Sequence, residues 1–123
     1  MKKVQTENAP AAVGPYSQAT VSGNLVFASG QLGLNDAGVI EGDVALQTEN
    51  AVKHLGEVLL AAGSSLDKVV KTTCFLSNIA DFAAFNEVYG KYFTSKPARS
   101  LIEAAALPKG SLVEIEAIAE IEA

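Results

Sequence analysis

The sequence predicts an α+β fold in which a mixed six-stranded sheet carries two helices on one face. Apolar residues recur with helical spacing in two stretches, residues 43–62 and 81–93. The other apolar stretches are rich in strand-forming residues and are bounded by turn signals. A hairpin, a helix, a strand, a helix and two strands follow one another, an order that favours one sheet with both helices on the same side. We expect residues 1–123 to form a single domain.

The N-terminal part is expected to contain an edge strand, a loop and a hairpin. Two prolines and a glycine forbid regular structure over residues 8–15, which therefore separate a short strand at 3–6 from the next one. Tight-turn residues at 22–24 join two strand-like stretches, 16–21 and 25–28. These two stretches are predicted to form an antiparallel hairpin.

Gly30 lies in the triplet Ser29-Gly30-Gln31, where we expect the second hairpin strand to end. A glycine at this point either supplies a positive φ or lets a ligand approach the backbone closely. The pattern alone slightly favours a third interpretation, an ordinary turn at the end of a strand. Gly30 is therefore a candidate site residue whose role the pattern leaves open.

Two amphipathic helices supply the layer that covers the sheet. The first follows a loop at 32–42, begins with Asp43 as N-cap and ends near Ala62, with Gly63 as its C-terminal cap. The second covers 81–93 and carries an apolar stripe rich in aromatic side chains. The residues of that stripe are Phe82, Phe85, Val88, Tyr89 and Tyr92.

Three strands complete the sheet, at residues 68–76, 97–103 and 112–121. The first alternates little, as expected for a strand in the middle of a sheet. The last places Val113, Ile115, Ala117, Ala119 and Ile121 on one face, and Leu112, Glu114, Glu116, Ile118, Glu120 and Glu122 on the other. Two helices cover one face only. Because the strand residues of the second face are too apolar for water, we expect another subunit there.

Arg99 is the most unusual residue of its strand. Its guanidinium is always charged, costs free energy to bury without a partner, and offers a planar fork that matches a carboxylate. Strand alternation puts Arg99, Leu101 and Glu103 on one face. The carboxylates of the last strand are its natural complement. From the pattern alone, a structural ion pair and a functional pair have about even odds.

Composition excludes several classes of function. The net charge of −5 argues against a surface for nucleic acids or anionic membranes, and the hydrophobic fraction of 49% favours an oligomer. We expect neither a signal peptide nor a membrane span. The one cysteine precludes an intrachain disulfide and fits a reducing cytosol.

The inventory of reactive side chains leaves a short set of candidates. His54 is expected to be a surface or half-buried helix residue, and Cys74 an inert residue of a buried strand. The sequence contains too few ligands for a His/Cys metal site, and it shows no phosphate loop, dinucleotide fingerprint or nucleophile elbow. The remaining candidates are Arg99, the strand carboxylates, Tyr16, Ser29 and the backbone amides near Gly30. This set suits a small anionic ligand and acid/base chemistry without a cofactor.

Several short motifs stand in an order and spacing that together are highly specific, although none is diagnostic alone. They are Thr6-Glu7-Asn8-Ala9-Pro10-Ala11-Ala12, Gly14-Pro15-Tyr16, Ala28-Ser29-Gly30-Gln31, Val70-Lys71-Thr72-Thr73, Asp81-Phe82 with Asn86, Pro97-Ala98-Arg99-Ser100, Leu107-Pro108-Lys109 and Val113-Glu114-Ile115-Glu116-Ala117-Ile118-Ala119. In these motifs the chain resembles, over essentially its whole length, the RidA (YjgF) family of reactive-intermediate imine deaminases.

The resemblance implies a chorismate-mutase-like fold and a homotrimer with a ligand cleft at each subunit interface, and the single cysteine favours a cytoplasmic location. It implies hydrolysis of 2-imino acids or their enamine tautomers, such as 2-iminobutanoate and 2-iminopropanoate, to 2-keto acids and ammonia without a cofactor. Arg99 would then bind the substrate carboxylate, and Glu114 would position and activate the attacking water. The other pocket residues that it implies are Tyr16, Ser29, Asn86 and, through their backbone amides, Gly30 and Leu101.

The chain departs from the family pattern at two places. Many members have a cysteine at the position of Leu101; we expect the leucine to be harmless because the backbone amide is the group used. The segment Thr94-Ser95-Lys96 is shorter than in typical deaminating members. If this loop borders the cleft, it changes the range of substrates.

Two alternatives stay open beside the deaminase. The first is a non-catalytic protein on the same scaffold that binds keto acids or related carboxylic acids and signals through the trimer. The second is the ribonuclease or translation-inhibitor activity attached to some family members. The acidic charge balance and the single histidine make RNA cleavage the poorest of the three.

Overall fold

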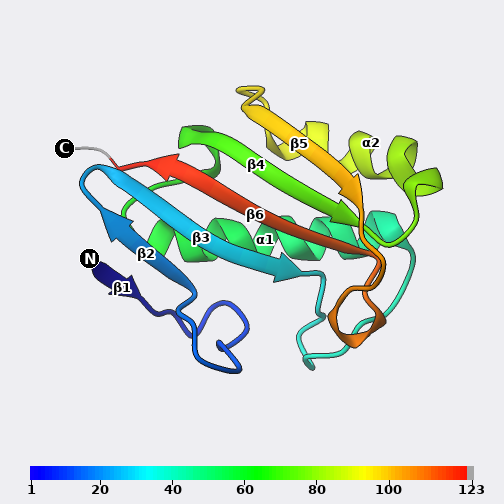
Figure 1. The fold of residues 1–123 in the computed structure, drawn as a ribbon, viewed down its shortest axis with the longest axis horizontal. Helices are drawn as coiled ribbons and strands as arrows, with labels where there is room; N and C mark the ends of the chain where they lie inside the picture. Colours follow the sequence, from blue (N-terminus) through cyan, green and yellow to red (C-terminus); the bar gives the residue numbers. More distant parts are fainter. Residues whose placement is uncertain (122–123) are drawn as a thin grey trace.

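The computed structural model describes residues 1–121, and over this range a six-stranded sheet forms one layer and two α-helices form the other (Figure 1). The strand order is β1-β2-β3-β6-β4-β5. The strands are β1 (Lys2–Val4), β2 (Ala19–Ser22), β3 (Leu25–Leu32), β4 (Val69–Leu76), β5 (Ala98–Glu103) and β6 (Val113–Glu120). The helices are α1 (Val44–Ala61) and α2 (Phe82–Tyr92), with the short 3-10 turns η1 (Leu66–Lys68), η2 (Ile79–Asp81) and η3 (Pro108–Gly110).

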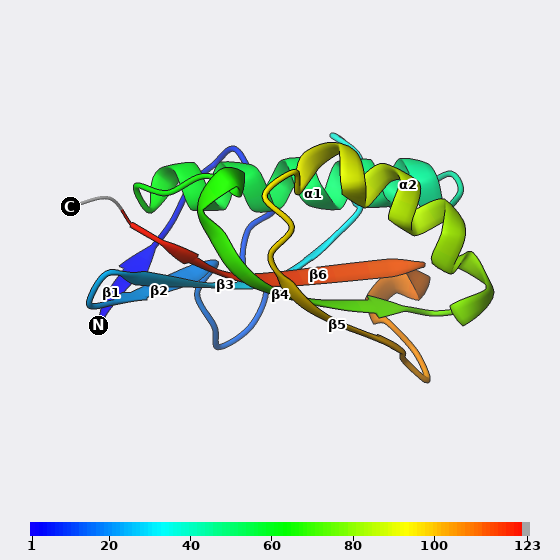
Figure 2. The same ribbon diagram turned by 90° about the horizontal axis from the view of Figure 1, so that it is seen from above.

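The sheet is mixed because one pair of strands is parallel. β4 and β5 run parallel, whereas the other pairs are antiparallel. Both α-helices lie on the same face of the sheet (Figure 2). α1 packs against β3 and β6, and α2 packs against α1. The predicted α+β class, the mixed six-stranded sheet and the helices on one face are confirmed. No helix in residues 1–121 is long and apolar enough to cross a membrane.

β6 lies in the middle of the sheet, between β3 and β4. Its inward residues pack under the helices and are almost completely buried: Val113, Ile115, Ala117 and Ala119. The residues between them are half-buried or exposed and lie on the open face: Glu114, Glu116, Ile118 and Glu120. The predicted alternation of the last strand is therefore confirmed over 113–120, while Glu122 lies outside the described residues.

Both ends of α1 are capped as predicted. The Asp43 side chain accepts a hydrogen bond of 3.0 Å from the backbone N–H of Leu46, which satisfies one orphan donor of the first turn. At the other end Gly63 has a φ of +88°, and the Ser64 N–H donates to the Leu59 carbonyl at 2.8 Å. This is the geometry of a glycine-terminated helix, because glycine adopts a positive φ without steric cost.

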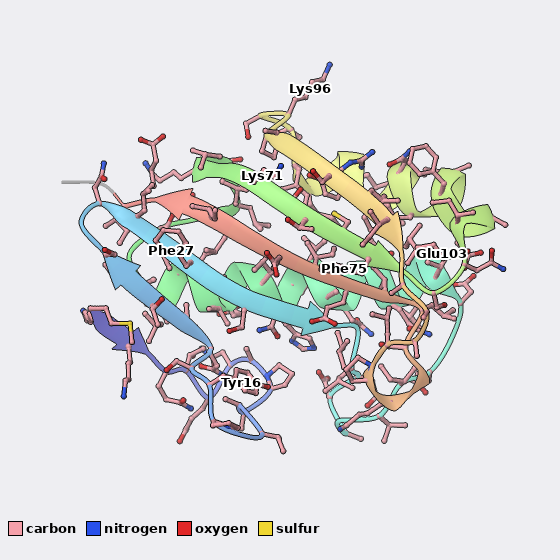
Figure 3. All side chains as sticks on the ribbon, in the orientation of Figure 1. Tyr16, Phe27, Lys71, Phe75, Lys96 and Glu103 are labelled. Carbon is pink, nitrogen blue, oxygen red and sulfur yellow. The ribbon has the colours of Figure 1, made fainter. Side chains whose placement is uncertain are left out.

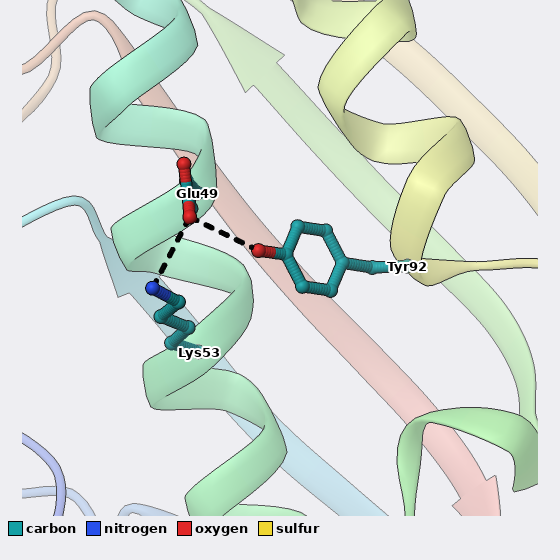
Figure 4. Close-up of polar contacts among 3 residues, drawn as sticks. All are labelled: Glu49, Lys53 and Tyr92. Carbon is teal, nitrogen blue, oxygen red and sulfur yellow. Dashed lines mark hydrogen bonds and ion pairs between the residues drawn. The ribbon is translucent and has the colours of Figure 1, made fainter.

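A small polar network joins the two helices at their solvent side (Figure 4). The carboxylate of Glu49 on α1 accepts a hydrogen bond of 3.2 Å from the Tyr92 hydroxyl of α2 and lies 3.1 Å from the Lys53 ammonium. The side chains of Lys53 and Glu49 are 60% and 42% exposed. Because solvent screens such a pair, we expect the network to contribute little stability.

The hairpin differs from the expectation at both strands. β2 begins at Ala19 rather than at residue 16, and β3 continues to Leu32 instead of ending at residues 29–31. The register of pairing between β3 and β6 shifts between Ala28 and Gln31. β3 therefore contains a bulge at this point and pairs with β6 again beyond it. A bulge of this kind redirects a strand without ending it.

The edge strand is also shifted, to Lys2–Val4 instead of residues 3–6. The reason is the side chain of Gln18, whose Oε1 accepts a hydrogen bond of 2.7 Å from the Thr6 N–H. Residues 5–18 therefore form a loop that is fastened by a side chain, and they do not continue either strand.

The open face of the sheet carries large apolar side chains. Phe27 of β3 and Phe75 of β4 lie on it (Figure 3), as does Lys71, whose ammonium donates to the Ser100 hydroxyl at 3.1 Å. Phe27 is 41% exposed and Ile102 is 53% exposed. Apolar surface of this extent on one side of a small sheet is typical of a face that meets another protein.

Candidate functional site

Four of the predicted site residues line one hollow, which we call the Glu114 chamber. Tyr16 comes from the N-terminal loop, Ser29 and Gly30 from β3, and Glu114 from β6. The chamber has a volume of about 520 Å³. Its other walls are Pro10, Ala11, Val13, Gln18, Gln31, Leu32, Leu34, Pro108 and Lys109. The sheet thus brings residues from distant parts of the sequence to one place.

The carboxylate of Glu114 lies directly over the backbone of Gly30. A Cβ atom placed on Gly30 would be 2.8 Å from Glu114 Cδ and even closer to its carboxylate oxygen. The φ of Gly30 is outside the positive region, and the residue lies inside β3. The expected turn at this residue is therefore wrong. A glycine is needed here because the Glu114 side chain occupies the space of a Cβ.

Burial raises the pKa of Glu114 above its usual value, and the neighbouring charge of Glu116 raises it further. Both effects disfavour the charged form. A carboxylate whose pKa is shifted toward neutrality is a better general base than an ordinary surface carboxylate. The chamber therefore contains one group that is suited to accept a proton from water.

Tyr16 and Ser29 form part of the chamber wall. The Ser29 hydroxyl donates a hydrogen bond of 2.6 Å to the Ser17 carbonyl, which ties β3 to the N-terminal loop. The Tyr16 hydroxyl accepts a bond of 3.3 Å from the Val13 N–H, and the residue is 53% exposed. This hydroxyl keeps its own proton available to donate to a bound molecule.

Sequence reasoning missed two residues of the chamber wall. Gln18 is buried, and its Nε2 donates to the carbonyls of Thr6 and Pro10 at 3.1 and 2.8 Å. Lys109 adopts a φ of +58°, in the region that favours glycine. Lys109 belongs to the motif Leu107-Pro108-Lys109, but the turn-forming residues of this motif predict only a loop and not a place in the site. Gln18 gave no signal, since a buried glutamine inside a strand-like stretch is unremarkable.

Arg99 lies away from this chamber, on the helix face of the sheet. Its Nη1 donates a hydrogen bond of 2.7 Å to Oδ1 of Asn86 on α2, so these two predicted residues do come together. Leu101, on the same face of β5, packs against the hydrophobic core. A recess of about 450 Å³ lies beside Arg99, and Thr94 and Lys96 form part of its wall. The shortened loop therefore borders Arg99.

Arg99 and Glu114 do not meet within one chain. β4 lies between their strands, and its residues Thr72 and Phe75 pair with Arg99 and Glu114 respectively. The two backbones are therefore separated by two strand spacings across the sheet and by three residues along the strands, which together amount to about 14 Å. The side chains also point to opposite faces of the sheet. A structural ion pair inside the chain, one of the two interpretations of the sequence, is therefore wrong.

The remaining reactive side chains are used structurally. His54 Nε2 lies 2.7 Å from the Leu34 carbonyl, which fixes the ring on the outside of α1. Cys74 is completely buried in β4, and burial raises the pKa of its thiol to about 11. Its predicted position in a buried strand is confirmed. Within residues 1–121 no group of three or more His, Cys, Asp or Glu side chains is placed to hold a metal ion.

Comparison with known proteins gives consistent matches over nearly the whole chain. A family model described as "Endoribonuclease L-PSP" matches residues 6–121. Human "2-iminobutanoate/2-iminopropanoate deaminase" is 46% identical over 119 residues, which cover 94% of this chain and 87% of the human protein. A Lactococcus lactis protein that carries a regulator name, AldR, is 49% identical over 125 residues and 99% of both chains.

The fold of a solved structure agrees with the sequence matches. The crystal structure of the YjgF gene product from E. coli superposes with a TM-score of 0.94 at 42% identity, and the match covers 99% of this chain and 100% of that one. The family model, the relatives and this fold therefore agree. The chain belongs to the endoribonuclease L-PSP family, the RidA (YjgF) family that its motifs resemble.

Proposed function

We propose that this protein hydrolyses 2-imino acids, such as 2-iminobutanoate and 2-iminopropanoate, to 2-keto acids and ammonia. The observation that carries the proposal is the Glu114 chamber, in which a half-buried carboxylate with a raised pKa lies over Gly30 and beside Ser29 and Tyr16. The deaminase name of relatives such as the human protein supports the same chemistry.

In the proposed reaction Glu114 acts as the base for a water molecule. An imine carbon next to a carboxylate is already electrophilic, so water adds to it once a proton is removed. Starting from the protonated imine, water forms the C–O bond, the C=N π electrons become the lone pair of the amine nitrogen, and Glu114 takes the proton that water loses. Glu114 then gives this proton to the amine nitrogen. The hydroxyl of the adduct returns a proton to Glu114 as the C=O bond forms and the C–N bond breaks, which releases ammonia and leaves the keto acid. A positioned base contributes about a hundredfold or more to such a step.

The proposal assigns carboxylate binding to Arg99 of a neighbouring copy of the chain. The Arg99 guanidinium is oriented by its hydrogen bond to Asn86. It lies too far from Glu114 of its own chain for one small substrate to contact both residues. A second copy bound to the apolar open face supplies the missing partner, and a cyclic homotrimer closes such contacts into three equal sites. A bidentate clamp orients the imine carbon for attack, which contributes several kcal/mol.

The other proposed pocket residues belong to the same site between two copies of the chain. The backbone amides of Gly30 and Leu101 donate to the bound acid, and Tyr16 and Ser29 complete the wall. β5 is an edge strand, so part of its backbone is free to bind a ligand. The leucine side chain at 101 then affects only the size of the pocket. We place the protein in the reducing cytosol, which suits its unpaired cysteine, and the chemistry needs no cofactor.

The test is ammonia release from freshly generated 2-iminobutanoate. We expect the wild type to accelerate release over the uncatalysed rate, and Arg99→Ala to lose most of that acceleration while folding normally. Arg99→Lys should lose most activity as well, because an ammonium does not replace the planar fork. An Arg99→Lys variant with the wild-type rate would remove the carboxylate-clamp role. Absence of acceleration by the wild type would overturn the proposal.

A non-catalytic binder of keto acids is the second candidate, and the regulator name of the Lactococcus relative favours it. Binding of 2-oxobutanoate by wild type without any turnover of the imine would select this alternative. RNA cleavage remains the weakest candidate, since the net charge is −5 and the one histidine contacts a backbone carbonyl. Cleavage that survived Arg99→Ala and varied between preparations would indicate a contaminant.

A further inference from the structure

Within residues 1–121, Arg99 contacts a stripe of α2 and forms no ion pair with a carboxylate. Its Cζ lies 4.9 Å from the centroid of the Tyr89 ring, 5.7 Å from that of Phe82 and 5.9 Å from that of Phe85. Asn86, on the same stripe, accepts the hydrogen bond from Nη1. These four residues recur at helical spacing, so one face of a single helix surrounds one side of the guanidinium.

Tyr89, of the same stripe, is bonded to β4, the strand next to that of Arg99. Its hydroxyl lies 2.7 Å from the Thr72 hydroxyl, and the two residues are 8% and 0% exposed. Thr72 is also the residue of β4 that pairs with Arg99 in the parallel register. The bond therefore joins α2 to the strand position next to Arg99, with the ring that contacts the guanidinium between them.

Packing alone does not explain this pair of hydroxyls. The Tyr89 ring is stacked on Phe93 at 4.3 Å and lies 5.4 Å from Phe85, so a phenyl ring would be held there without any hydroxyl. Replacing both partners of a buried hydrogen bond with apolar groups of the same shape is nearly neutral for stability. What the bond adds is direction, because it fixes the distance and tilt of the ring relative to β4.

We propose that Tyr89, anchored by Thr72, is a positioning residue that holds the Arg99 guanidinium in the orientation in which it binds a substrate carboxylate. This inference rests on the carboxylate-binding role of Arg99 in the proposed function. The aromatic face stabilises the cation and sets its plane, and Asn86 fixes one edge of the fork. The other N–H donors then meet a carboxylate without a further loss of side-chain freedom, which strengthens binding.

The experiment measures binding of 2-oxobutanoate, a stable keto acid, by isothermal titration calorimetry. Tyr89→Phe and Thr72→Val each remove one hydroxyl and keep the shape of the side chain. We expect each to raise Kd roughly three- to tenfold, the effect of one directional hydrogen bond. Thr72→Ser keeps the hydroxyl and should bind like wild type. Tyr92→Phe, also on α2, is the matched control, because it removes a hydroxyl that bonds Glu49 of α1 (Figure 4) and not a partner of Arg99.

The double variant Thr72→Val/Tyr89→Phe separates positioning from stability. Each single variant removes the bond between the two hydroxyls and should lower the melting temperature. The double variant leaves neither hydroxyl without its partner and removes only the weak contact in which the Cys74 thiol donates to the Thr72 hydroxyl at 3.8 Å. Its melting temperature should therefore recover toward wild type while its Kd stays raised. In turnover, the variants should raise KM with little change in kcat, as expected when binding of the carboxylate is weakened equally in ground and transition states.

Recovery of wild-type Kd together with melting temperature in the double variant would overturn the inference and leave a purely structural hydroxyl pair. Wild-type affinity in Arg99→Ala, or no binding by the wild type, would overturn it as well. The test does not depend on catalysis. A wild type that binds 2-oxobutanoate but releases no ammonia from the imine would contradict the proposed function, while the comparison of Kd values would still decide the role of Tyr89.

Discussion

Gly30 and Glu114 show how a single atom decides the geometry of the chamber. The carboxylate occupies the space where a side chain at position 30 would begin. We expect Gly30→Ala to displace the Glu114 carboxylate, since a flexible side chain gives way more easily than two paired strands. Activity on 2-iminobutanoate should fall by about 100-fold, the effect of a misplaced catalytic group, with the melting temperature little changed.

The matched control for this prediction is Gly56→Ala in α1. A Cβ there would meet Leu66 at an ordinary contact distance of 3.5 Å, far from the chamber. This variant should keep wild-type activity. Equal activity of wild type and Gly30→Ala would show that the observed position of the Glu114 carboxylate is not required for turnover.

The raised pKa of Glu114 predicts how activity depends on pH. The base form is lost as pH falls through the raised pKa, so kcat should decline at a higher pH than for an ordinary glutamate. Glu114→Gln should reduce kcat by about a hundredfold or more and abolish this acidic limb, while binding of keto acids is retained. A pH–rate profile of both proteins, with Glu120→Gln on the same face as the control, provides the measurement. Wild-type turnover in Glu114→Gln would exclude it as the base.

The raised pKa of Glu114 also predicts how the stability of the fold depends on pH. A carboxyl group with a higher pKa in the folded state binds protons more tightly when the chain is folded, so it favours the fold at low pH. That contribution is complete below the unfolded pKa and is lost as pH rises through the folded pKa. Glu114→Gln should therefore have a higher free energy of unfolding than wild type at pH 7, and the difference should shrink toward pH 4. Urea denaturation at both pH values measures it, and a difference that grew on acidification would contradict the raised pKa.

At the scale of elements, the loop at residues 5–18 depends on one side chain. Gln18 bonds the backbone of Thr6 through both ends of its amide and also reaches the Pro10 carbonyl. Gln18→Met keeps the volume but leaves these backbone groups unpaired, so we expect a loss of about 2 kcal/mol in the free energy of unfolding. The loop forms part of the Glu114 chamber, so activity should fall too.

Limited proteolysis within residues 5–18 reports the same change directly, because a loop that has lost its fastening is cut faster. Gln5→Met is the control, since Gln5 is an exposed residue of similar size. Equal cleavage rates in Gln18→Met and wild type would mean that the packing of the loop, and not its hydrogen bonds to Gln18, holds it in place.

Elements with local signals were predictable from the sequence, and those set by distant contacts were not. Asp43 and Gly63 mark the ends of α1 to within one residue, because caps are local chemistry. β3 was expected to end at a serine–glycine pair, yet it continues because β6 offers a partner on the far side of the bulge. Gln18 lies in a strand-like stretch, but its side chain is committed to a loop twelve residues away.

The candidate site was likewise predictable in its residues but not in the distances between strands. The motifs identified Tyr16, Ser29, Gly30 and Glu114, and these residues do share one chamber. Strand alternation also predicted correctly that Arg99 and Leu101 lie on the same face of their strand. The relation of Arg99 to Glu114 was not predictable, because it depends on the insertion of β6 beside β4 and on which face each strand turns toward the helices.

For the whole molecule, the separation of Arg99 from Glu114 predicts complementation between inactive variants. If each site takes Arg99 from one copy and Glu114 from another, a mixed oligomer of Arg99→Ala and Glu114→Gln contains sites in which both residues are intact. Random assembly of equal amounts gives about a quarter of all sites in this state. Denaturing and refolding the two variants together should therefore restore about a quarter of wild-type activity.

Each variant refolded alone is the control and should remain inactive. Sedimentation analysis of the same samples should show an oligomer, as we expect from the apolar open face. A mixture without any recovery would mean that the two residues do not act in one shared site between copies. A monomeric mass would contradict the interface model independently of activity.

The central position of β6 has a consequence for how the protein is made in the cell. Among the six described strands, β3 and β4 do not pair directly and are joined through β6, which is synthesised after the other five. About 80 residues separate the end of β3 from the start of β6, and translation at about 5–20 residues per second takes roughly 4–16 s to add them. Throughout that interval the nascent chain exposes an unpaired edge of β3, so its solubility during translation depends on whatever shields that edge.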